Sequence, residues 1–389
     1  MSPAVTATDT PASALLPAGM MDVLPPHAAF EAATIERLLG RFAGFGYERV
    51  KPPLIEFEDT LLAGSGAALA RQTFRLMDPV SQRMLALRPD MTLQIARIAA
   101  SRMAHRPRPL RLAYGGQVVR VRGSQLRPQR QFGVVGAELI GADATEADAE
   151  IIVMATGALA GIGMQDITVD LGLPSLVPAL LADRVLPEAA RARLQAALER
   201  KDITSVGALA PALGTETARL LCRLLTATGP AAEALAMLAD ELLPREALAA
   251  LAMLERVAGL LGEAAPHLTL TVDPVERRGF EYHCGVTFAL FARGVSGDLG
   301  RGGRYLTGND EDATGVTLFL DTILPALPVP PPAERIFLPF GTDREVGERL
   351  RDEGWITVAG LDGTEPPIPT ARRLMCSHLL ADGQVRTLD

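Results

Sequence analysis

The spacing of apolar and polar positions predicts a chain that opens with a helix and continues mainly as strands. Residues 28–45 place apolar side chains near helical spacing, with Glu and Arg between them, which is typical of an amphipathic helix. Residues 47–57 contain Pro52-Pro53, which forbids a helix and favours an edge strand or an interface turn. Further strand-like runs occupy residues 83–87, 110–121, 131–140, 167–171 and 268–272.

A second long helix is predicted for residues 145–160. Thr145 can act as its N-cap, and acidic residues in its first turns complement the positive end of the helix dipole. From residue 175 to 262 the chain is dense in Ala and Leu and is interrupted by Gly and Pro, which predicts an inserted bundle of helices. Strand character resumes at 268–272 and continues through 281–292.

A proline cluster at 326–332 predicts a stiff linker to a short C-terminal segment, residues 333–389. That segment reads as strand, helix and strand at residues 336–340, 344–353 and 356–359. It is too short for a robust core of its own, so we expect it to dock on the main body.

These patterns predict the α+β class, with an antiparallel sheet, flanking helices, a helical insertion and a short C-terminal α/β segment. Residues 17–325 would form the main domain, and residues 1–16, rich in Ala, Pro and Thr, a disordered tail. A parallel dinucleotide-binding fold is excluded, because it needs a regular alternation of strand and helix that this chain lacks.

Composition narrows the functional classes. The 389 residues carry a formal net charge of −8, which argues against a protein that coats nucleic acid. The 3 cysteines form no CxxC pair, the histidines lack metal-ligand spacing, and no apolar run is long enough to span a membrane. The N-terminus lacks the charged start of a secretion signal. We therefore expect a soluble, cytoplasmic protein that needs neither a metal nor another cofactor.

Four clusters of residues carry candidate chemistry, and the first two surround the predicted strand at 110–121. Asp90 and Thr92 lie where a strand runs into a helix, and they can accept hydrogen bonds from an ammonium group; alternatively, Asp90 caps the helix. The arginine-rich hairpin 120–132 suits a phosphate or a carboxylate, since guanidinium makes bidentate contacts. A solvated basic loop is the alternative.

The other two clusters lie on later strands. Glu138 alternates with Val135 and Leu139, so its carboxylate can face the concave side of a sheet and bind a cationic or imidazole ligand; partial exposure to solvent is the alternative. Residues 277–283 place arginines beside a glycine and two aromatic residues, which suits a ligand pocket, although surface ion pairing and core packing explain them equally well. Glycines at residues 297–303 are not followed by GK[ST], which excludes a P-loop.

In this order, the clusters resemble the catalytic domain of class II aminoacyl-tRNA synthetases, and specifically histidyl-tRNA synthetase. The resemblance covers about residues 17–325. In the first half of the chain it rests on GMMDVLP at 19–25, a motif 1 segment that contains Pro53, and LRPDMT at 87–92. The proline of motif 1 lies at the dimer interface in that family. Further along the chain, the resemblance rests on a motif 2 loop at 120–132, RGFEY at 278–282 and a GGRY strand at 302–305.

The family pattern implies which side chains of this chain would hold histidine. The ammonium group would be bound by Asp90 and Thr92, the imidazole ring by Glu138, and the carboxylate by Arg278 with Arg120 close by. The aromatic residue of the same segment, Tyr282, would line the pocket. Two family positions differ, because His283 replaces a second tyrosine and Val134 replaces a glutamine.

Other departures fall on the ATP side of the pattern. The glutamate of motif 2 that helps to hold ATP is Arg122 here, and the arginine of motif 3 that contacts the phosphates is Thr322. Pro128 replaces a second loop arginine, and the C-terminal segment is too short for a full anticodon-binding domain. Loss of a phosphate-binding arginine removes several kcal/mol, about 3–4, of transition-state stabilisation. Adenylation and tRNA charging are therefore expected to be absent.

A synthetase-like core without ATP chemistry resembles the regulatory subunits of ATP phosphoribosyltransferase. That resemblance implies a non-catalytic subunit that assembles with a short-form catalytic subunit into a hetero-oligomer, serves the first step of histidine biosynthesis and confers inhibition by L-histidine. It also implies a self-dimer through the region around Pro53. The alternatives are a divergent histidyl-tRNA synthetase and a synthetase-like protein that acts on another substrate.

Overall fold

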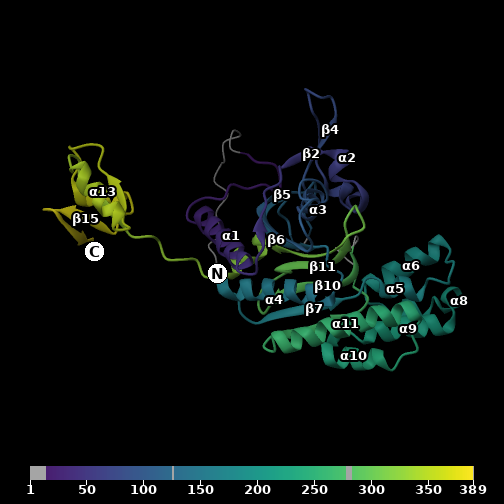
Figure 1. Ribbon diagram of the computed structural model, residues 1–389. Coiled ribbons are helices and arrows are strands. Elements are labelled where there is room, and N and C mark those ends of the chain that lie inside the picture. The colour runs from purple at the N-terminus through teal and green to yellow at the C-terminus, as the bar shows by residue number, and fades with distance from the viewer. Residues whose placement is uncertain (1–14, 125–126, 277–282, 389) are drawn as a thin grey trace. The chain divides into compact units, whose positions relative to one another are not determined.

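A nine-stranded sheet forms the framework of the larger part of the chain (Figure 1). The structure is a computed structural model that describes residues 15–124, 127–276 and 283–388. The chain divides into two units, Met1–Pro328 and Val329–Asp389. Of the tail predicted at 1–16, residues 1–14 lie outside the described residues, and Leu15 and Leu16 are exposed.

The strands of the large sheet follow the order β1-β5-β6-β12-β11-β10-β7-β9-β8. Neighbours are antiparallel except for the parallel pairs β1 with β5 and β7 with β9. The antiparallel α+β class is therefore confirmed. The strands are β1 (Glu48–Arg49), β5 (Leu110–Val119), β6 (Gln131–Ile140), β7 (Ile167–Gly172), β8 (Gly229–Pro230), β9 (Thr269–Asp273), β10 (His283–Ala292), β11 (Gly300–Leu306) and β12 (Asp312–Phe319).

Helices cover the two faces of this sheet unequally. One face packs against α1 (His27–Ala43) and α4 (Thr145–Ile162), with α11 (Arg245–Ala264) behind α4. The other face packs against the short α3 (Thr92–Ser101), whose apolar residues join a smaller buried cluster with the side chains of β5 and β6. The less covered face therefore has room for a cavity.

The helix predicted from residue 145 begins as expected, but its N-cap assignment is wrong. The N-cap residue is Ala144, and Thr145 is already the first helical residue, because the chain stays extended up to Ala144 (φ −70°, ψ 141°). The helix ends at Gly163, whose left-handed backbone (φ 110°) favours glycine.

Between β7 and β9 the chain forms seven helices, which pack around a largely Leu and Ala core that is continuous with the core of the main sheet. The short strand β8 interrupts them and pairs with β9 at the sheet edge. The helices are α5 (Leu176–Leu180), α6 (Glu188–Glu199), α7 (Ile203–Gly207), α8 (Ala210–Leu213), α9 (Thr215–Thr226), α10 (Ala231–Ala239) and α11.

A separate three-stranded sheet precedes the cavity-facing helix α3. Its order is β2 (Ile55–Phe57), β4 (Met84–Leu87) and β3 (Arg75–Met77). The short helix α2 (Glu58–Leu61) and the 3-10 helix η2 (Gly64–Gln72) connect β2 to β3.

Before the second unit, the chain forms α12 (Leu320–Ile323) and the 3-10 turn η3 (Leu324–Ala326). The second unit is a four-stranded sheet in the order β14-β13-β15-β16. It contains β13 (Arg335–Leu338), α13 (Arg344–Asp352), β14 (Ile356–Ala359), α14 (Pro367–Arg373), β15 (His378–Ala381) and β16 (Gln384–Thr387).

This segment, which we expected to be too short for a robust core, has small buried clusters of its own. Two buried clusters form within it, one around Ile336 and Leu350 and one around Phe337 and Leu379. The strand β13 separates them, because its alternating side chains face opposite sides of the sheet and each side is covered by a helix.

Candidate functional site

Glu138 lies at the centre of the less covered face of the main sheet. Along β6, Val135, Ala137 and Leu139 join the core beneath α1 and α4, so the alternation of the strand turns Glu138 the other way. It is flanked by Leu112 on β5 and Gly315 on β12. Glu138 is fully buried, with 0% of its surface exposed, so the alternative of a partly exposed carboxylate is wrong.

Two buried tyrosines donate hydrogen bonds to this carboxylate. The Tyr114 hydroxyl lies 3.1 Å from Oε1 of Glu138, and the Tyr305 hydroxyl lies 3.0 Å from Oε2. The Tyr114 oxygen is also 3.2 Å from Oγ1 of Thr92 and 2.9 Å from Oγ1 of Thr317. When the Thr317 hydroxyl donates to Tyr114, the proton of Tyr114 is directed to Glu138, and the carboxylate is held in one orientation.

Glycines on the neighbouring strands make room for these side chains. A methyl group at Gly315 would lie 1.8 Å from Oε2 of Glu138, and one at Gly136 would lie 2.3 Å from the Tyr114 hydroxyl. Both distances are far below a van der Waals contact. The glycines of the sheet therefore determine where the acidic group can sit.

Burial raises the pKa of Glu138 to about 8, and this desolvation outweighs the opposing effect of the hydrogen bonds from Thr92, Tyr305 and Tyr114. The nearby carboxylate of Asp90 raises it further. The same burial, together with the charge of Glu138, raises the pKa of Tyr114 well above its ordinary value. At neutral pH the site therefore carries a proton that a basic ligand can share.

Asp90 and Thr92 lie at the start of α3 and border the same cavity. The backbone N–H of Thr92 donates to Oδ1 of Asp90 at 2.7 Å, so Asp90 does bind the helix start, although the N-cap residue is Met91. The capping and ligand-binding interpretations are thus compatible, because this bond uses one carboxylate oxygen and Asp90 still lines the cavity.

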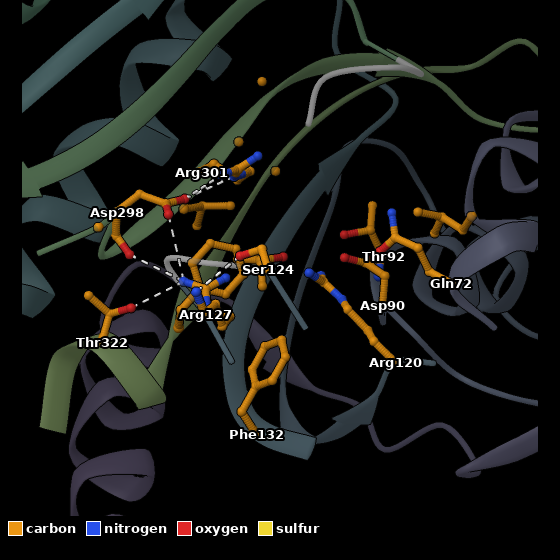
Figure 2. Close-up of a pocket in the computed structure, with 18 of the residues that line it drawn as sticks. Gln72, Asp90, Thr92, Arg120, Ser124, Arg127, Phe132, Asp298, Arg301 and Thr322 are labelled. Carbon is orange, nitrogen blue, oxygen red and sulfur yellow. Dashed lines mark hydrogen bonds and ion pairs between the residues drawn. The ribbon is translucent and has the colours of Figure 1, made fainter. Parts of the chain in front are cut away.

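The cavity that joins these groups has a volume of about 450 Å³. Figure 2 shows Asp90, Thr92 and Arg120 pointing toward one another at one end, with Arg127 and Asp298 at the other. The lining comes from β6, β11 and β12, from the start of α3 and from the loop between β5 and β6. A volume of this size suits a small ligand such as an amino acid.

Arg120 lies beside Asp90 at the acidic end of the cavity (Figure 2). Its Nε donates to the carbonyl of Pro89 at 3.2 Å, and its guanidinium lies 5.2 Å from the centre of the Phe132 ring. Burial lowers its pKa, partly offset by the charge of Asp90. The remaining N–H groups of Arg120 can therefore meet a ligand carboxylate close to the ammonium-binding Asp90.

A second arginine of the hairpin 120–132, Arg127, also lines the cavity. Arg127 has its Nε 2.7 Å from Oδ2 of Asp321, and its guanidinium lies 3.9 Å from the centre of the Phe319 ring. It also donates to Oγ1 of Thr322 at 3.1 Å. The solvated-loop alternative is wrong for Arg127, whose side chain is 12% exposed.

Two predicted site residues, Arg278 and Tyr282, lie outside the described residues, as does the rest of the segment 277–282. The residue that follows them, His283, lines the cavity and packs edge-on against Tyr305. Burial, assisted by the charge of Arg301, lowers the pKa of His283 to about 3, so its imidazole is neutral.

Tyr114, Tyr305 and Thr317 were not predicted from the sequence. Tyr114 alternates with Leu112 on β5, and its pairing with Gly136 was a usable signal, because a tyrosine opposite a glycine marks room for a large polar side chain. No group of three or more His, Cys, Asp or Glu side chains suited to a metal occurs within the described ranges. Over the same residues, no helix is long and apolar enough to cross a membrane.

An antiparallel sheet with helices on one face and a polar cavity on the other, bordered by the start of a helix and an arginine-rich hairpin, is the architecture of a class II aminoacyl-tRNA synthetase catalytic domain. The sequence profile of the family described as Histidyl-tRNA synthetase matches residues 19–323. A histidyl-tRNA synthetase from Nostoc superposes with a TM-score of 0.74 at 16% identity, covering 94% of this chain and 91% of that one, which shows the shared fold.

Proteins with higher sequence identity to this chain identify its family more specifically. The ATP phosphoribosyltransferase regulatory subunit of Rhodospirillum centenum is 54% identical over 380 residues, 97% of each chain. That of Paramagnetospirillum magneticum is 53% identical, covering 97% of this chain and 99% of its own. A structure of an ATP phosphoribosyltransferase regulatory subunit/histidyl-tRNA synthetase from Bacillus halodurans has a TM-score of 0.82 at 28% identity, covering 94% of this chain and 97% of that one. The chain belongs to the family of ATP phosphoribosyltransferase regulatory subunits, within the histidyl-tRNA synthetase-like proteins.

Proposed function

We propose that this chain is the non-catalytic, cytoplasmic regulatory subunit of an ATP phosphoribosyltransferase and that L-histidine is its effector. The observation that carries the proposal is the buried Glu138, held by two tyrosines at one end of a cavity of about 450 Å³, which has room for an amino acid. An imidazole ring matches this group, because it can share one proton with a carboxyl whose pKa is about 8.

The rest of the ligand fits the same end of the cavity. The ammonium group of histidine would meet the carboxylate of Asp90 and the hydroxyl of Thr92, and its carboxylate would meet Arg120. From the resemblance, Arg278 and Tyr282 would complete the site. Isothermal titration of the purified protein with L-histidine tests this placement: Glu138→Gln should weaken binding at least about tenfold. Histidine binding that is equal in wild type and variant would contradict it.

Aminoacylation is expected to be absent, because Arg122 and Thr322 stand where a working synthetase has its ATP-binding glutamate and arginine. Histidine-dependent exchange of pyrophosphate into ATP is the direct assay. The expected rate is background; a clear histidine-dependent rate would instead support a divergent histidyl-tRNA synthetase.

Assembly is proposed at two levels, a hetero-oligomer with a short-form catalytic subunit and a self-dimer around Pro53. The carbonyl oxygens of Pro52 and Pro53 accept hydrogen bonds from Arg88 at 3.0 and 3.4 Å, while the ring of Pro53 is exposed. The neighbouring three-stranded sheet leaves several apolar side chains exposed: Leu54, Ile55, Leu76, Met77 and Met84. A rigid segment beside an exposed apolar surface suits a two-fold interface.

Co-elution with the catalytic subunit of the same organism tests the hetero-oligomer. One complex peak containing both chains is expected in size-exclusion chromatography with light scattering. Two separate peaks at micromolar concentration would count against this assembly, whereas loss of the self-dimer alone would leave it standing.

A further inference from the structure

At the end of the cavity away from Glu138, arginine and aspartate side chains neutralise one another. The guanidinium of Arg127 lies 2.7 Å from Oδ2 of Asp321 and 3.6 Å from Oδ1 of Asp298. Asp298 also pairs with Arg301, at 2.8 and 2.9 Å. Two arginines and two aspartates thus form one neutral network, which Figure 2 shows in part around Arg127.

Three of the four side chains in this network are held away from solvent, whereas Arg301 is 34% exposed. The side chains of Arg127, Asp298 and Asp321 are only 12%, 15% and 8% exposed. One face of the Arg127 guanidinium packs on Phe319, and Phe132 lies 5.2 Å away from it. Because these groups are largely buried, their charges are weakly screened, and the attraction between Arg127 and the two carboxylates is stronger than at a surface.

The same arrangement opposes an incoming polyanion. A phosphate that approached Arg127 would also approach the carboxylates of Asp298 and Asp321, which repel it and would have to be displaced from the guanidinium. A third arginine that lines the cavity, Arg122, is exposed and makes no hydrogen bond or ion pair within the described parts of the chain. A single solvated arginine gives little affinity for a polyphosphate.

We infer that Asp321 and Asp298 are specificity-determining residues: by neutralising Arg127 from within, they exclude nucleotides and other polyphosphates from the cavity. This goes further than the loss of the motif 3 arginine at Thr322, because it assigns the exclusion to carboxylates that are present. It concerns the end of the cavity opposite to Glu138, and it holds whether or not histidine is the effector.

The test uses the full-length protein, inorganic tripolyphosphate as the probe and isothermal titration as the readout. Asp321→Asn and Asp298→Asn each remove one of the two carboxylates that neutralise Arg127 while keeping the side-chain shape, so each should bind tripolyphosphate at least about tenfold more tightly than wild type. Asp382→Asn removes a carboxylate from an exposed pair with Arg386 and controls for net charge; no gain is expected there.

Two further variants identify the group responsible. Adding Arg127→Ala to Asp321→Asn should abolish the gain, since the released cation is gone. Thr322→Arg alone should give less than about a threefold gain, because both carboxylates remain. Histidine titration and thermal unfolding of each variant confirm that the protein is folded, and an unfolded Asp321→Asn leaves Asp298→Asn as the decisive variant.

Three results would overturn the inference. Tight binding of tripolyphosphate by the wild type would show that nothing excludes it. A gain in Thr322→Arg with none in the aspartate variants would assign the exclusion to the missing arginine alone. A gain that survives Arg127→Ala would separate it from this network. If the wild type does not bind histidine, the proposed function is contradicted, but this inference still stands.

Discussion

Histidine binding should depend on pH in a way that the buried carboxyl of Glu138 determines. In the empty cavity its pKa is about 8, whereas an ordinary imidazole titrates near pH 6.5. Between about pH 6.5 and 8 the cavity brings a proton on Glu138 and the ligand brings a neutral ring, so the complex forms around one shared proton without exchange with solvent. Affinity should therefore be nearly constant over this window.

Outside the window, affinity should fall on both sides. Above about pH 8 neither partner carries the shared proton, which must be taken up from solvent, so binding weakens about tenfold per pH unit. Below about pH 6.5 both partners are protonated, and one proton must leave, with the same slope. Titration in two buffers of different ionisation enthalpy counts these protons directly.

Glu138→Gln isolates the effect, because an amide of the same shape does not titrate. The amino group of histidine also loses its proton in alkaline solution, but it does so with both proteins, so the ratio of their affinities reports Glu138 alone. That ratio should fall about fivefold between pH 8 and 9 and approach a tenfold fall per pH unit above that. A ratio that stays constant from about pH 7 to 9.5, or proton uptake that is equal in both proteins, would refute the reasoning.

Three further predictions concern the architecture around Glu138 and the proposed dimer. Gly315→Ala should weaken histidine binding at least about tenfold, because its methyl group would displace the carboxylate, whereas Gly157→Ala, on an open face of α4, should leave binding unchanged. Titration calorimetry checks both, and equal binding in the two variants would contradict the first. The unfolding free energy of Glu138→Gln should exceed that of wild type by roughly 4 kcal/mol at pH 8 but match it near pH 4. The reason is that the glutamate of the unfolded chain loses its proton near pH 4.3, whereas that of the folded chain loses it only near pH 8. A difference in unfolding free energy that does not change with pH in urea denaturation would exclude this. Leu54→Asp should convert the self-dimer into a monomer in light scattering, and an unchanged mass would move the interface elsewhere.

The sequence predicted the main sheet well where its strands are long and alternate. The range predicted for β6 was that of the structure, and Glu138 could be singled out because apolar neighbours alternate with it. Its partner Tyr305 could not be found in this way, since Tyr305 lies far from Glu138 in sequence and meets it only through the pairing of β6, β12 and β11.

The C-terminal unit shows a different limit. The strands β15 and β16 were missed, although Asp382-Gly383 between them is a strong hairpin signal with positive φ at both residues (52° and 73°). Arg127 was expected to contact a ligand or solvent with the rest of its loop. Its pairing with Asp321 could not be predicted, because the two residues lie far apart in sequence and meet only in the folded cavity.

The most direct test of the central claim measures phosphoribosyl-ATP formation by the short-form catalytic subunit of the same organism, mixed with this chain, with and without L-histidine. The account predicts activity that requires this chain and falls with histidine. It also predicts that Glu138→Ala keeps the activity and the co-elution but needs at least about tenfold more histidine for inhibition, whereas Arg344→Ala, in an exposed pair, behaves as wild type. Activity indifferent to this chain would contradict the regulatory role, and unchanged inhibition of Glu138→Ala would place the effector site elsewhere.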